Sequence, residues 1–133
     1  MSCTLTVVGA GLDIDEFVEN TGIEGFTKKY KGDLVSPSRN KRLEYSFASI
    51  ITSRVNFDNL KLQIEETEDF LVKHKNNLKC IATTRGIDFA TIDFGANSDL
   101  GHENKAQYFF FPPSLLLVCA ELKLGLELSL YSF

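Results

Sequence analysis

The chain has 133 residues, 44% of them hydrophobic, which is enough for one domain with its own core and too little for two domains. Its 14 basic and 18 acidic side chains give a net charge of −4, which disfavours a nucleic-acid binder that depends on a dense array of cations. The apolar run at residues 108–120 is too short to cross a bilayer and contains two prolines, so we expect it to be core.

The three cysteines, Cys3, Cys80 and Cys119, are odd in number and widely spaced. Secreted small domains use even, closely spaced sets, so this pattern favours free thiols in a cytosolic protein. The first residues carry no basic start typical of a signal peptide, which supports the same cytoplasmic setting. We expect Cys80 and Cys119 to act as small buried hydrophobic residues.

The first half of the chain predicts strand, helix, loop and strand. Residues 4–8 are apolar and β-branched, as in a strand, and Asp13 with Glu16 three residues later is typical of a helix start. That helix should end before Gly22. Residues 25–41 are basic and contain glycine and proline, so we expect a loop with a short strand, followed by a strand at residues 43–52.

The clearest helix is predicted at residues 58–74, where Leu60, Ile64 and Leu71 recur at helical spacing. Residues 78–84 and 87–94 predict two strands that turn at Arg85 and Gly86, and a change of parity within the second predicts a bulge or a break. A polar loop at residues 95–106 follows, and residues 107–111 form a short strand or lead into the next element.

Residues 114–123 predict a third helix that is apolar nearly all round and should therefore be sandwiched against the sheet. The alternation after Gly125 predicts a final strand with one wet face. The order β-α-β-β-α-β-β-α-β predicts one α+β domain at residues 1–133. We expect a single mixed or antiparallel sheet of about five or six strands, with three helices packed mainly on one face.

Two motifs that suggest chemistry favour plainer interpretations. Gly9 and Gly11 between strand and helix resemble a dinucleotide-binding turn, but Ile14 stands at the third glycine position and the helix opens with acidic residues, which repel a pyrophosphate. His102 lies near Asp99 and Glu103, where an acid–base or metal role is conceivable, although a solvated loop histidine is the favoured interpretation. We therefore expect no catalytic residue, cofactor or metal.

Charge is unevenly distributed. One acidic cluster is predicted on the first helix and a second on the middle helix: Asp13, Asp15, Glu16 and Glu19, then Glu65, Glu66, Glu68 and Asp69. The residues that follow the first helix are basic: Lys28, Lys29 and Lys31, with Tyr30 among them. An acidic face followed by a basic loop suggests a polarised surface, although ordinary solvated surface is the favoured interpretation of both stretches.

Several short patterns resemble a family of small bacterial domains of unknown function, numbered forty-two seventy-nine. They are Gly11-Leu12-Asp13-Ile14-Asp15-Glu16, then Thr21-Gly22-Ile23, then Lys31-Gly32-Asp33, with a closing helix and strand. The chain departs from the family where Glu24 replaces a proline and Tyr45 a tryptophan. The resemblance covers nearly the whole chain and implies a bacterial, cytosolic α+β domain, without implying an activity.

Three functions remain open at this point. The leading hypothesis is a non-catalytic protein-binding module, of which an immunity-type protein that neutralises a toxin is one form, with the acidic cluster Asp13, Asp15, Glu16 and Glu19 as its first candidate surface. The second is a domain that binds a small anionic ligand through Lys28, Lys29 and Lys31. The third is an enzyme with a site around Asp99, His102 and Glu103. A homodimer through the final strand depends on whether that strand lies at the edge of the sheet.

Overall fold

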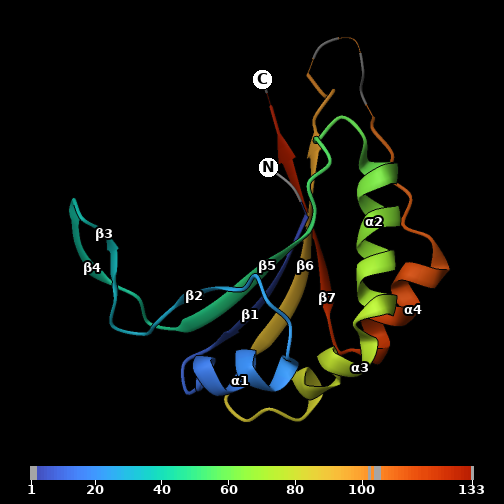
Figure 1. Cartoon of the computed structure of the whole chain (residues 1–133). Helices are drawn as coiled ribbons and strands as arrows, with labels where there is room; N and C mark the ends of the chain where they lie inside the picture. Colours follow the sequence, from blue (N-terminus) through green and yellow to red (C-terminus); the bar gives the residue numbers. More distant parts are fainter. Residues whose placement is uncertain (1–2, 102, 104–105, 133) are drawn as a thin grey trace.

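In a computed structural model that describes residues 3–101, 103 and 106–132, the chain forms a mixed five-stranded sheet, a separate hairpin and four helices (Figure 1). The α+β class is confirmed, with one short helix more than expected. In chain order the elements are β1 (Cys3–Gly9), α1 (Ile14–Thr21), β2 (Thr27–Lys29), β3 (Leu34–Ser36), β4 (Arg39–Arg42), β5 (Ser46–Ser53), α2 (Leu60–Lys73), α3 (Lys75–Leu78), the 3-10 helix η1 (Lys79–Ala82), β6 (Phe89–Asn97), α4 (Pro113–Glu121) and β7 (Gly125–Tyr131).

The strand order is β2-β5-β1-β6-β7, with β1 in the centre. β1 pairs antiparallel with both β5 and β6, β2 pairs antiparallel with β5, and β7 pairs parallel with β6. A parallel pair needs a crossover connection, and α4 lies within it. The sheet is therefore of the mixed type, and β2 and β7 form its two edges.

One face of the sheet carries the core. Alternate residues of the central strands, among them Leu5, Ile92 and Phe94, are completely buried and belong to the same apolar cluster as Phe17 of α1 and Leu71 of α2. The cluster also includes residues of α4, so helices from three parts of the chain cover this face. The residues of opposite parity form an open face that no helix packs against among the described residues.

The strand expected at residues 78–84 is wrong. Leu78 and Ile81 are buried from α3 and η1, and their spacing of three residues suits a tight helical turn better than a strand. The bulge expected after residue 87 is also wrong, because Ile87 precedes β6 and β6 pairs with β1 without a register shift. Phe89 simply points to the open face, where its side chain is 52% exposed.

The basic region at residues 25–41 is more structured than expected, since it contains β2 and most of a β3–β4 hairpin. The hairpin projects away from the body of the molecule, to the left in Figure 1, and its residues are nearly all exposed. β5 begins at Ser46, three residues later than the strand expected from residue 43. Residues 107–111 form no strand and lead into α4, and the exposure of their side chains alternates along the chain.

Candidate functional site

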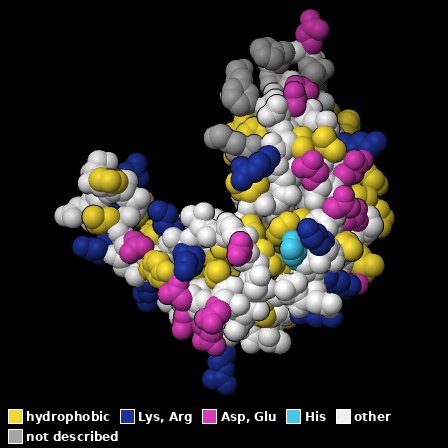
Figure 2. Space-filling view, in the orientation of Figure 1, with side chains coloured by type: hydrophobic (Ala, Val, Ile, Leu, Met, Phe, Trp, Pro, Cys, Tyr) yellow, Lys and Arg dark blue, Asp and Glu magenta, His cyan; other side chains and the backbone are white. Residues whose placement is uncertain are grey.

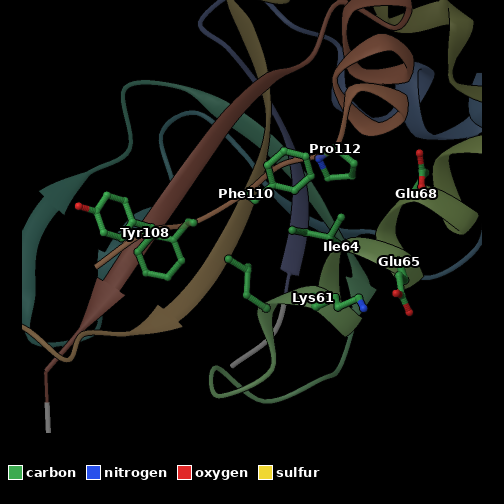
Figure 3. A pocket seen from close by; sticks show the side chains of 9 residues that line it. Lys61, Ile64, Glu65, Glu68, Tyr108, Phe110 and Pro112 are labelled. Carbon is green, nitrogen blue, oxygen red and sulfur yellow. The ribbon is translucent and has the colours of Figure 1, made fainter. Parts of the chain in front are cut away.

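A groove of about 460 Å³ lies between α2 and residues 106–112, here called the aromatic segment. Figure 3 shows the side chains of both elements that line it. Its walls come from the first three turns of α2 and from the aromatic segment: Leu60, Lys61, Ile64, Glu65, Glu68, Tyr108, Phe109, Phe110 and Pro112.

The N-terminal part of α2 is held in place by a helix cap, Asn59, and by a buried polar side chain, Gln63. Asn59 caps the helix by accepting a hydrogen bond from the Leu62 N–H at 3.1 Å. Gln63 is completely buried and donates its amide to the carbonyl oxygens of Asn56 and Gly95, at 3.0 and 2.8 Å. Its carbonyl accepts the Gly95 N–H at 3.3 Å, so the side chain occupies the place of a neighbouring strand beside the end of β6.

The aromatic segment is held by two anchors. The Gln107 amide donates to the Asn97 carbonyl at 2.9 Å, and its own carbonyl accepts the Asp99 N–H at 2.9 Å. Phe111 packs on Phe94 of the core with ring centroids 5.4 Å apart. Because extended residues alternate in direction, the neighbours of these anchors point outward.

Tyr108 and Phe110 are consequently 90% and 76% exposed. Each exposed aromatic side chain leaves a large apolar area in contact with water, and contiguous exposed apolar area marks interaction surfaces. The expectation that residues 108–120 are core is therefore wrong for part of the run.

α4 extends this apolar surface. It was expected to be sandwiched, but it buries only one side, and Leu116 and Leu117 are 49% and 62% exposed. The cause is topological: α4 packs on α2 and β7, and no described element covers its outer side. α4 has nine residues, and no helix in the described ranges is long and apolar enough to cross a membrane.

Among the residues that the structure describes, the rim of the groove is mainly acidic. Glu65 and Glu68 lie one turn apart on α2, and Lys61 is the one basic residue of this described part that lines the groove. Figure 2 shows acidic and hydrophobic side chains next to one another over this part of the molecule. An apolar floor with a negative rim suits a partner that combines apolar and basic side chains.

The acidic cluster on α1 is less available than expected. Asp13 caps α1 by accepting the Glu16 N–H at 3.1 Å. The Asp15 carboxylate accepts hydrogen bonds from Lys28 at 2.8 Å and from the Tyr30 hydroxyl at 2.7 Å, and these bonds lower the pKa of Asp15. Glu16 and Glu19 are exposed, so two of the four residues present their side chains to solvent.

The three lysines of the anion-binding hypothesis do not converge. Lys28 faces the helix layer and pairs with Asp15, which raises the pKa of Lys28. Lys29 pairs opposite Phe47 on the other face of the sheet, and Lys31 lies beyond β2. None of the three lysines lines the groove.

Gly9 and Gly11 lie where one turn of the chain packs closely against another turn at Gly86. A Cβ on Gly9 would lie 1.8 Å from the Gly86 carbonyl oxygen, and a Cβ on Gly86 would lie 2.4 Å from that of Gly11. The Ala10 N–H donates to the Asp88 carboxylate at 3.0 Å, so a group of the protein itself occupies the position an anion would take. This geometry explains the motif without a dinucleotide.

Of the suggested catalytic residues Asp99, His102 and Glu103, the structure describes two. Asp99 and Glu103 are exposed, and His102 lies outside the described residues. Among the residues that the structure places, no cluster of three His, Cys, Asp or Glu side chains could hold a metal. Cys3 and Cys119 are buried, and burial raises the pKa of each thiol to about 11, so both are inert core cysteines. The expectation of a buried side chain is therefore confirmed for Cys119, but it is wrong for Cys80, which is only partly buried at the end of the helix layer.

Sequence reasoning missed the groove because it assigned the aromatic run to the core. The signal that was present is the run Tyr108 to Phe111 before two prolines, since an extended stretch that cannot enter a central strand exposes every second side chain.

Comparison with known proteins adds no relative: no family model, curated protein or solved structure matches the chain.

Proposed function

We propose that this chain is a non-catalytic protein-binding module that receives its partner in the groove between α2 and the aromatic segment. The observation that carries the proposal is the exposure of Tyr108 and Phe110 beside an apolar groove wall. Aromatic side chains are the commonest energetic centres of protein interfaces, because they bury a large area at a small cost in conformational entropy.

The chemistry of the rim defines the partner. Glu65 and Glu68 favour a protein segment that places apolar anchors in the groove and basic side chains around them. Glu66 and Asp69 add negative charge to the same helix, although Glu66 also accepts a hydrogen bond from Ser53 at 2.9 Å. The partner that fits best is a basic amphipathic helix or loop.

An immunity-type function, in which the domain neutralises a cationic toxin, is the most specific form of this proposal. What supports it is the acidic surface of α2, rather than that of α1, where Asp15 is already paired with Lys28. Glu16 and Glu19 would then steer the approach of the partner without forming the centre of the interface.

A small anionic ligand is the weaker alternative. It would need Lys28 to leave Asp15, and Lys29 to turn from the opposite face of the sheet. No observation favours that rearrangement, so we retain the protein-binding proposal.

The experiment is an affinity capture from the cells that produce the protein, with three baits compared by quantitative mass spectrometry. The baits are the wild type, Phe110→Ser, and Val72→Ser as matched control, since Val72 is 61% exposed on α2 but does not line the groove. We expect one protein that the wild type and the control retain and that Phe110→Ser loses. Because the rim is charged, rising salt should weaken its capture. Equal recovery on all three baits would remove the groove from the proposal.

A further inference from the structure

β7 is an edge strand, and no described residue pairs with its outer side. Every hydrogen bond that the described residues make to its backbone comes from the β6 side. Tyr131 stacks on Phe57 with ring centroids 4.6 Å apart, which fixes the end of the strand. The outer side is therefore an ordered row of free donors and acceptors, ready to pair with another strand.

The register with β6 shows which residues carry this row. The Tyr131 carbonyl accepts the Ser98 N–H at 2.7 Å, so the odd-numbered residues of β7 direct their backbone groups toward β6. The N–H and C=O groups of Leu126, Leu128 and Leu130 consequently point outward. The side chains of Leu126 and Leu128 pack on the core, and Leu130, opposite Ala96 of β6, points to the same side but is half exposed. Glu127 and Ser129 face the open side, where the Ser129 hydroxyl donates to Asp93.

We infer that β7 pairs antiparallel with β7 of a second copy of this chain, about a two-fold axis at Leu128. In this register Leu128 lies opposite itself, and Leu126 lies opposite Leu130 of the second copy. Three outward N–H groups from each copy then find carbonyl partners, which completes a ladder of six hydrogen bonds. Glu127 lies opposite Ser129 of the second copy, so no like charges meet.

The two edges of the sheet differ in their protection. β2 is three residues long and carries two lysines, which are features that keep edge strands from pairing. β7 is seven residues long, contains neither lysine nor proline, and has no register shift against β6. Its single charge, Glu127, lies on the open face. β7 is therefore the edge that suits association.

α4 supplies the additional area that a dimer needs. Stable interfaces bury roughly 1,200–2,000 Å² in total, more than one pair of short strands provides. α4 packs against β7, and its Leu116 and Leu117 are exposed. The two-fold axis is perpendicular to the sheet, so it leaves both helix layers on one face of a continuous sheet and brings the two α4 helices toward each other.

Sedimentation equilibrium of the purified chain provides the first test, and we expect a monomer–dimer equilibrium. Leu130→Pro removes an outward N–H without touching the bonds to β6, and should weaken dimerisation at least tenfold, whereas Leu130→Ala should change it by less than about threefold. The double change Leu116→Glu with Leu117→Glu should also weaken it, whereas Val72→Glu should not. A chain that is monomeric at every concentration would overturn the inference.

Disulfide trapping tests the register and does not depend on variants that weaken the fold. Directly opposed residues of this kind are about 5.5 Å apart at Cα, within the range that a disulfide spans. In a Cys80→Ser background, Leu128→Cys should crosslink with itself, whereas Leu126→Cys alone should not. Leu126→Cys mixed with Leu130→Cys should crosslink. A dimer in which Leu128→Cys crosslinks no faster than Leu62→Cys on α2 would overturn the β7 interface. Both tests are independent of the capture experiment, because they require no other protein.

Discussion

The replacement Gln63→Leu tests how α2 is attached to the sheet. The leucine has nearly the volume of glutamine, so it leaves no large cavity, but it removes every hydrogen bond that the side chain makes to the Asn56 and Gly95 backbone. An unpaired buried backbone group costs about 1–3 kcal/mol, and Gly95 loses the partner of both its N–H and its C=O. With the gain from burying a more apolar side chain subtracted, we expect a loss of about 2–4 kcal/mol in the free energy of unfolding.

Urea unfolding followed by far-UV circular dichroism measures this loss as a shift of the midpoint at unchanged slope. With a slope of about 2 kcal/mol per molar urea, in the middle of the usual range, the midpoint falls by about 1–2 M. Asp69→Leu makes a similar polar-to-apolar change on an exposed position of the same helix and should stay within about 0.5 kcal/mol. A Gln63→Leu variant as stable as this control would refute the proposed attachment.

Three further predictions concern other parts of the fold. Gly9→Ala should destabilise by about 2 kcal/mol or more, because its Cβ would overlap a carbonyl oxygen of the neighbouring turn, while Gly11→Ala, with no atom within 4 Å of its Cβ, should leave the thermal midpoint nearly unchanged. NMR titration should place the Asp15 carboxyl pKa below 3.8, and Lys28→Met should raise it. The ion pair therefore stabilises the fold at neutral pH, and this contribution is lost as the pH falls through the lowered pKa of Asp15. The free energy of unfolding of Asp15→Asn should consequently change less with acidification than that of the wild type. Of the three thiols, Cys80 should react first with a thiol reagent in the native state, and all three should react after denaturation; equal native rates would contradict the burial of the other two.

The sequence pattern predicted those helices and strands in which the apolar positions coincide with the side that is buried in the fold. α2 was predictable because its apolar spacing coincides with its buried side, and β7 because its alternation coincides with one wet face. The strand predicted around Leu78 was wrong because a short apolar run fits a strand as well as a tight helical turn. Only packing against α1 and α2 decides between the two.

The candidate site could not be predicted because it depends on contacts between residues that are far apart in the sequence. The neutralisation of Asp15 by Lys28 requires the register of β2 on β5, which directs Lys28 toward α1. The exposure of Phe110 follows from the anchoring of Phe111 on Phe94, 17 positions earlier in the chain. Hydrophobicity alone assigns all of these aromatic residues to the core, so the groove becomes visible only in the fold.

Photo-crosslinking at position 110 tests the central claim most directly. Benzoylphenylalanine in place of Phe110 keeps an aromatic side chain at the groove, and the same probe in place of Val72 samples exposed surface of α2 that does not line the groove. After irradiation in the cells that produce the protein, we expect one adduct from position 110 that is absent from position 72, and the crosslinked peptide should combine apolar with basic residues. Identical adducts from both positions, or adducts only with a second copy of this chain, would contradict the proposed binding groove.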